Sequence, residues 1–162
     1  MYNTLDNIVW LTEDGKKEEV ESLVTSLSQF FRTTLSGGRD FIRLKEEISH
    51  IESYLQIQKF RYSDVLSYEI SMPEELGNYS IVKMTLQPIV ENALYHGLKN
   101  RREIGKIRIA AEEMDDGIRI TVADDGIGMT GEELEKLRQL ISGEIRAGEN
   151  NTGFGMAMSR NA

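Results

Sequence analysis

Apolar residues along the first 62 positions repeat with the period of an α-helix. The clearest apolar stripe comprises Val20, Leu23, Val24, Leu27, Phe30 and Phe31. The pattern begins at about residue 2 without a capping residue, and Asp14 and Gly15 predict an interruption after the first three turns. We expect this helical stretch to end near Leu35, because a Ser-Gly-Gly segment follows it.

A second amphipathic helix is predicted from about Lys45 to Phe60. Its apolar face carries Leu44, Ile48, Ile51 and Leu55. Two such helices joined by a short loop form a hairpin, which is too thin to bury both apolar stripes alone. The pattern therefore predicts that a second copy of the chain completes a four-helix bundle.

From about Leu66 the apolar pattern alternates with a period of two, which is typical of strands. The predicted order is a strand over 66–72, a helix over 83–98, strands over 106–111 and 118–122, a helix from Gly131, and a polar, glycine-containing loop over 142–153. The segment Asp115-Asp116-Gly117 predicts a hairpin turn, and Thr130 predicts the cap of the helix that follows it. We expect an α+β layer sandwich, with one sheet and helices on one face.

Composition narrows the possible functions. The net charge of −8 disfavours nonspecific binding to nucleic acid or to an anionic membrane. The chain has no cysteine, which excludes disulfides and thiolate chemistry and fits a cytoplasmic setting. No apolar run approaches the roughly 20 residues that a membrane span needs.

The stretch VADDGIGMTG, residues 122–131, places Gly126, Gly128 and Gly131 between a predicted strand and a predicted helix. Dinucleotide-binding folds use this glycine spacing, but Asp124 and Asp125 would repel a pyrophosphate at the turn. A calcium-binding loop is excluded because the residues at its first and third ligand positions, Thr121 and Ala123, carry no carboxylate.

The same stretch suits the recognition of adenine. The carboxylate of Asp124 can accept a hydrogen bond from the exocyclic amine, and the glycines after it let the base approach the backbone closely. Taken alone, however, the motif favours a plain surface turn.

Two further segments carry polar groups that fit a nucleotide. The predicted helix QPIVENALYHGLKN contains Glu91, Asn92, His96 and Lys99, and Asn92 and His96 share one face. An amide oxygen, a carboxylate and an ammonium in one row can hold Mg²⁺ and a triphosphate, although this helix alone favours a solvated polar stripe. The third segment, NTGFGM at 151–156, offers backbone N–H groups for phosphates. Together the three segments indicate a nucleotide site.

These three segments resemble the N-box and the two glycine boxes of GHKL ATPases, which include the catalytic domains of histidine kinases. The segments YNTLDNIVWL, LSQFFRTTLS, LKEEISHIESYLQIQKFRYSDVLSYEI and LQPIVENALYHGLKN resemble LytS/YehU-type sensor histidine kinases of two-component signalling. The resemblance implies a dimerisation-type helical hairpin over 1–62 and a GHKL (HATPase) mixed-sheet sandwich over 63–162. It implies a transferase that uses ATP to phosphorylate a protein histidine in a phosphorelay.

The resemblance also implies roles for individual residues. Asn92 matches the Mg²⁺ ligand, Glu91 the acid that polarises the attacking group, and Asp124 the aspartate that binds adenine. The other residues at ATP-binding positions are His96, Lys99, Gly126, Gly128, Met129, Gly153, Phe154 and Gly155. The loop over 142–152 matches the ATP lid.

The resemblance further implies a chain that is truncated at both ends. The family's phosphoacceptor histidine would lie just upstream of Met1, so no acceptor is assigned in this chain. His50 is interpreted as a helix-surface residue. The resemblance fades after about Ala157, so the last strands of the sheet would be missing. We expect a fragment that binds Mg-ATP but does not phosphorylate itself.

The expected partners are ATP, a second copy bound through residues 1–62, and the receiver domain of a response regulator, but no nucleic acid. Membrane attachment would come only through an upstream region, which would make this the cytoplasmic portion of a membrane-anchored sensor. Two other functions stay open: an ATP hydrolase or serine kinase on the same fold, and a non-catalytic dimeric docking module.

Overall fold

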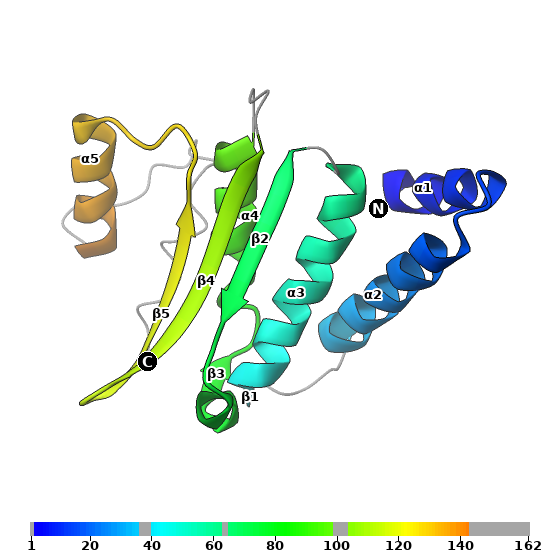
Figure 1. The fold of residues 1–162 in the computed structure, drawn as a ribbon. Helices are drawn as coiled ribbons and strands as arrows, with labels where there is room; N and C mark the ends of the chain where they lie inside the picture. The colour runs from blue at the N-terminus through cyan, green and yellow to red at the C-terminus, as the bar shows by residue number, and fades with distance from the viewer. Residues whose placement is uncertain (1, 36–39, 63–64, 99–103, 143–162) are drawn as a thin grey trace.

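The structure, a computed structural model, describes residues 2–35, 40–62, 65–98 and 104–142. It has the predicted α+β architecture, with helices packed against a mixed sheet (Figure 1). The elements are α1 (Tyr2–Glu13), α2 (Lys17–Leu35), β1 (Phe41–Arg43), α3 (Leu44–Arg61), β2 (Leu66–Ser71), the short 3₁₀ helix η1 (Glu74–Asn78), β3 (Ser80–Val82), α4 (Gln87–Leu98), β4 (Gly105–Met114), β5 (Gly117–Asp124) and α5 (Gly131–Ser142).

The helical part follows the predicted pattern closely. Gly15 lies between α1 and α2. Its backbone is left-handed, with φ of +72°, a conformation that glycine adopts without steric cost. Leu11, Leu23 and Ile57 form a small buried cluster where α1, α2 and α3 meet. The hydroxyl of Ser26 on α2 also donates a hydrogen bond of 2.6 Å to Gln56 Oε1 on α3. Helices α2 and α3 therefore form the predicted hairpin.

The main sheet contains three strands in the order β2-β4-β5. Strand β2 pairs with β4 in parallel, and β4 pairs with β5 in antiparallel across a tight turn. Burial alternates along β4: Ile107 and Ile109 are buried, whereas Arg108 and Ala110 are exposed. One face of the sheet is therefore apolar, and α3 and α4 pack on it.

Helix α3 buries its apolar stripe inside this chain. Leu44, Ile48, Ile51 and Leu55 share one core with the inner face of the sheet and with α4. The sequence pattern predicted that this stripe needs a second copy for burial; instead the sheet of the same chain covers it. Figure 1 shows α3 between β2 on one side and α2 on the other.

Several features of the structure differ from the predicted elements, and the 3₁₀ helix η1 is one of them. Helix α4 begins at Gln87 rather than at Lys83, and the residues before it form a turn in which Met84 has φ of +61°. Strands β1 and β3 were not predicted; they pair in antiparallel as a separate two-stranded sheet. Each of them has only three residues, too few to show a periodic pattern.

Candidate functional site

The candidate site lies where α4 packs against β4 and β5. Asp124 is the last residue of β5, and its register partner on β4 is the buried Ile107. Successive residues of a strand point to opposite faces, so Asp124 follows Ile118, Ile120 and Val122 on the face that carries the core. The carboxylate of Asp124 is thus aligned with the side of the sheet on which α4 lies, and it is exposed at the end of the strand.

The neighbouring carboxylate has a structural role. Asp125 Oδ1 accepts a hydrogen bond of 2.8 Å from the Lys106 backbone N–H, and the Asp125 N–H donates to the Lys106 carbonyl at 3.2 Å. These bonds close the end of the β4–β5 ladder. The two adjacent acids therefore bond different segments: Asp125 joins the end of β5 to β4, whereas Asp124 bonds the glycine turn that follows it.

The glycine turn after β5 is tightly organised. The Gly126 N–H donates a hydrogen bond of 2.8 Å to Asp124 Oδ1, and Gly128 is left-handed with φ of +69°. Met129 beyond it is half exposed. A Cβ atom added to Gly128 would meet no atom within 4 Å, so the backbone conformation is what calls for glycine there.

Helix α5 follows this turn and has the predicted cap. Thr130 Oγ1 accepts a hydrogen bond from the Glu133 N–H at 3.3 Å, and Glu133 Oε2 accepts one from the Thr130 N–H at 2.8 Å. This reciprocal arrangement is a capping box. The bonds from Thr130 also lower the pKa of Glu133. The cap fixes where the glycine turn ends and α5 begins.

Helix α4 presents two of the predicted polar residues. Asn92 is half-buried, and Glu91 is exposed and accepts a hydrogen bond of 2.7 Å from Gln87 Nε2 one turn earlier. His96 lies in the last turn of α4. Lys99, Gly153, Phe154, Gly155 and the predicted lid over 142–152, apart from Ser142 at the end of α5, lie outside the described residues.

His50 corrects one interpretation. It is completely buried on α3 rather than on the helix surface, and its ring stacks on Phe30 of α2 with centroids 4.7 Å apart. Neither ring nitrogen has a hydrogen-bond partner in the described part of the chain. Burial lowers the pKa of His50; Lys83 lowers it further, while Glu47 and Glu91 oppose the shift.

Glu47 is the polar residue that sequence reasoning missed. Its side chain on α3 is completely buried, and its carboxylate accepts two backbone hydrogen bonds from the turn before α4. One signal was present in the sequence: Glu47 lies three residues after Leu44 and one before Ile48, which places an acid on an apolar stripe.

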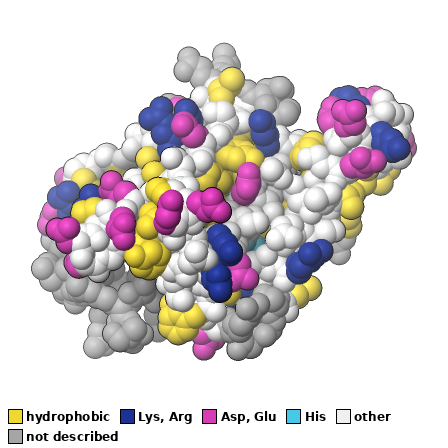
Figure 2. Space-filling model, turned by 60° about the horizontal axis from the view of Figure 1, so that its bottom comes forward, with side chains coloured by type: hydrophobic (Ala, Val, Ile, Leu, Met, Phe, Trp, Pro, Cys, Tyr) yellow, Lys and Arg dark blue, Asp and Glu magenta, His cyan; other side chains and the backbone are white. Residues whose placement is uncertain are grey.

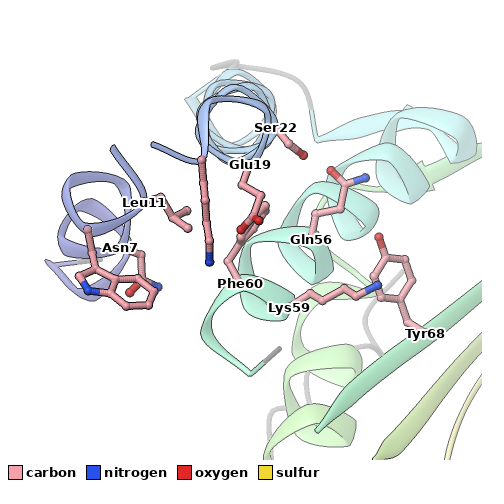
Figure 3. A pocket seen from close by; sticks show the side chains of 10 residues that line it. Asn7, Leu11, Glu19, Ser22, Gln56, Lys59, Phe60 and Tyr68 are labelled. Carbon is pink, nitrogen blue, oxygen red and sulfur yellow. The ribbon is translucent and has the colours of Figure 1, made fainter. Parts of the chain in front are cut away.

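The structure also contains a hollow whose lining includes none of the predicted nucleotide-site residues. It has a volume of about 530 Å³ and lies between α1, α2, α3 and β2, away from Asp124. Its lining includes Asn7, Leu11, Gln56, Lys59, Phe60 and Tyr68 (Figure 3). Burial, together with Glu52, raises the pKa of the Tyr68 hydroxyl, and a hydrogen bond with Gln56 opposes the shift.

Surface charge is mixed in sign. Figure 2 shows Lys and Arg side chains next to Asp and Glu side chains over the face that it draws. On the exposed face of the sheet, Lys106 Nζ lies 2.7 Å from Glu69, and Arg119 lies 3.1 Å from Glu112. Such pairs neutralise the basic side chains locally.

The donor set can be tested against a bound Mg²⁺ and ATP. Across the described segments, no three His, Asp or Glu side chains form a metal-binding group. Mg²⁺ commonly keeps several waters and binds one or two protein oxygens together with substrate phosphates. One amide oxygen from Asn92 and one carboxylate for a base, from Asp124, therefore fit a metal–nucleotide complex better than a metal ion alone.

No helix within the described residues has both the length and the apolar character that crossing a membrane requires.

Two parts of the chain match known protein families. Residues 80–162 match the family described as histidine kinase-, DNA gyrase B-, and HSP90-like ATPase, and residues 1–66 match the family described as histidine kinase. The chain is 33% identical over 135 residues to the sensor histidine kinase YesM of Bacillus subtilis, which covers 83% of this chain and 23% of that protein. It is 32% identical over 145 residues to the sensor protein kinase HptS of Staphylococcus aureus, which covers 90% of this chain and 27% of that protein. The chain thus spans about a quarter of the length of these relatives.

Proposed function

The chain belongs to the family of histidine kinase-, DNA gyrase B- and HSP90-like ATPases, and on that premise we propose that it is the ATP-binding core of a two-component sensor histidine kinase. The observation that carries the proposal is the packing of α4, with Glu91 and Asn92, against β5, whose inner face ends in the exposed carboxylate of Asp124. The match of residues 1–66 to histidine kinases favours this member of the family over an ATP hydrolase.

Each described site residue has one role in this proposal. Asp124 accepts a hydrogen bond from the exocyclic amine of adenine, and Gly126 and Gly128 allow the base to lie against the backbone. Asn92 donates its amide oxygen to Mg²⁺. Glu91, which Gln87 holds at 2.7 Å, orients the attacking group.

Six further residues complete the proposed site, and among them the side chain of Met129 lies within the described structure. His96 and Lys99 would contact the triphosphate, and Gly153 and Gly155 would bind phosphates through backbone N–H groups; Met129 and Phe154 would border the nucleotide. ATP, when bound, supplies the γ-phosphoryl group for transfer to a histidine imidazole. The protein contributes positioning and charge stabilisation to such a transfer.

We assign the remaining functions to the two parts of the chain. Residues 1–62 would form the homodimer, and the exposed Leu5, Val9 and Trp10 of α1 offer an apolar surface for it. Residues 63–162 would form the catalytic part, with α3 packed on it. The resemblance of both parts to LytS/YehU-type kinases favours that subtype, a receiver domain as phosphoryl acceptor, and a cytoplasmic position in a membrane-anchored sensor.

Calorimetry with Mg²⁺ and a non-hydrolysable ATP analogue tests the proposal. We expect the chain to bind the analogue, and we expect Asp124→Asn to weaken binding by about 10- to 100-fold. The amide is uncharged, and its single oxygen has to serve both the Gly126 N–H and the adenine amine. Asp125→Asn is the matched control; its amide oxygen can still accept from the Lys106 N–H, so affinity should stay unchanged.

Two results would contradict the proposal. A folded chain that binds no analogue would support a docking module, and equal losses in Asp124→Asn and Asp125→Asn would remove the adenine assignment. Steady release of phosphate from ATP without any protein partner would favour the hydrolase instead.

A further inference from the structure

A buried acid on α3 holds the start of the helix that carries the proposed Mg²⁺ ligand. Glu47 is 0% exposed, and its two carboxylate oxygens accept separate hydrogen bonds: Oε2 from the Met84 N–H at 3.0 Å and Oε1 from the Leu86 N–H at 2.9 Å. A buried carboxylate is stable only when hydrogen bonds or opposite charges compensate its lost hydration. These two donors supply that compensation, so Glu47 and the turn before α4 depend on each other.

Thr85 Oγ1 donates a hydrogen bond of 2.7 Å to the Val82 carbonyl within the turn, but the residue at the helix cap has no polar side chain. Leu86 occupies the cap position of α4, since its carbonyl accepts the first bond of the helix from the Val90 N–H, and leucine has no side-chain oxygen with which to cap. Met84 is left-handed with φ of +61°, a conformation that is unfavourable for residues other than glycine. Glu47 therefore provides from another helix what the local sequence lacks, and its negative charge faces the positive end of the α4 dipole.

The same turn is also attached to α2. Lys83 Nζ donates a hydrogen bond of 3.0 Å to the Thr34 carbonyl near the end of α2, and the Lys83 N–H donates to the Asp40 carbonyl at 2.9 Å. One turn after Glu47 on α3, His50 stacks on Phe30 of α2. The lead-in to α4 is thus held between the two helices of the hairpin.

We propose that Glu47 is a positioning residue for the nucleotide site: it fixes the start of α4, and hence the places of Glu91 and Asn92, relative to the helical hairpin. The inference rests on the proposed function, because it matters for activity only if Asn92 and Glu91 serve bound Mg-ATP. Gln87 is the first residue of α4, and its side chain donates a hydrogen bond of 2.7 Å to Glu91. The start of α4 is therefore bonded directly to one of the two site residues.

The test replaces Glu47 with Gln in the full chain. The amide keeps one acceptor but directs its N–H₂ group at a backbone N–H, so one of the two bonds is lost. We expect the Met84 and Leu86 amides to exchange with deuterium at least about 10-fold faster. We expect the affinity for the ATP analogue, per folded molecule, to fall by a similar factor. Glu47→Asp, which keeps the charge on a shorter side chain, should lie between the two proteins.

Glu52→Gln is the matched control. It removes the same charge from the same helix at an exposed position, so neither amide exchange nor affinity should change. The inference is overturned if folded Glu47→Gln protein melts earlier but binds the analogue with unchanged affinity, since the role is then structural only. It is also overturned if Glu52→Gln loses as much affinity.

The two proposals fail in different ways. If the unsubstituted chain binds no analogue, the proposed function fails. Slower or unchanged amide exchange at Met84 and Leu86 in Glu47→Gln would separately overturn the claim that Glu47 fixes the start of α4. If Glu47→Gln does not fold, the comparison of Glu47→Asp with the unsubstituted chain decides through the same two measurements.

Discussion

Replacing His50 with leucine should stabilise the protein. The His50 ring is completely buried, and neither of its nitrogens has a partner among the described residues. An unsatisfied buried polar group costs about 1–3 kcal/mol, so the two nitrogens together cost at least about 2 kcal/mol. Leucine removes that cost but also removes the stacking on Phe30, which contributes about 0.5–1.5 kcal/mol. The net gain in the free energy of unfolding should be about 1 kcal/mol at pH 7.5.

The gain should increase in acid. Burial holds the pKa of His50 below its ordinary value of 6.5, and the carboxylates of Glu47 and Glu91 only partly offset the effect. Below pH 6.5 the unfolded chain therefore binds more protons at this residue than the folded protein does, so folding loses stability as the pH falls. Leucine does not titrate, and the advantage of His50→Leu over the unsubstituted protein should widen between pH 7.5 and pH 5.

Urea unfolding followed by far-ultraviolet circular dichroism at pH 7.5, 6.0 and 5.0 measures both effects. His50→Gln is the control: it cannot titrate but keeps a polar group in the same place, so it should lose the pH dependence without the gain at pH 7.5. His96 is present in all three proteins and cancels in the differences. A His50→Leu protein that is less stable at pH 7.5 refutes the unpartnered imidazole, and a constant difference across the three pH values refutes the lowered pKa.

Two further substitutions test the packing and the capping. Leu55→Ala removes a completely buried side chain from the core that α3 shares with the sheet, so the free energy of unfolding should fall by about 2–5 kcal/mol. Val82→Ala, at an exposed position of β3, should change it by less than about 0.5 kcal/mol, and equal losses would contradict the assignment of the core. Thr130→Ala removes the capping hydroxyl of α5, which should cost about 1 kcal/mol and speed amide exchange in the first turn of α5, whereas unchanged exchange there would show that the cap is not needed.

Local signals explain which elements were predictable. Gly15, the Asp115-Asp116 turn and the Thr130 cap act through neighbours in sequence, and each lies where the pattern predicts a break or a start. The inward alignment of Asp124 also follows from strand alternation once β5 is recognised.

The missed features depend on contacts between distant segments. The start of α4 is set by Glu47, on a different helix, and the burial of His50 is set by Phe30 on α2. Strands β1 and β3 exist because residues 41–43 and 80–82 meet in space. The roles of Lys99, Gly153, Phe154 and Gly155 stay predictions, because these residues lie outside the described part of the chain.

The parallel pairing of β2 with β4 has a consequence for how the chain folds. Leu66 pairs with Gly105, and β3 and α4 lie between them along the chain, whereas β4 and β5 are joined by a turn and can pair early. Pairing between distant segments is slow because the loop must close first. During synthesis, α3 and β2 leave the ribosome before β4 does. In that interval no complete sheet is present to bury the apolar face of α3. We expect the nascent chain to depend most on chaperones at this stage.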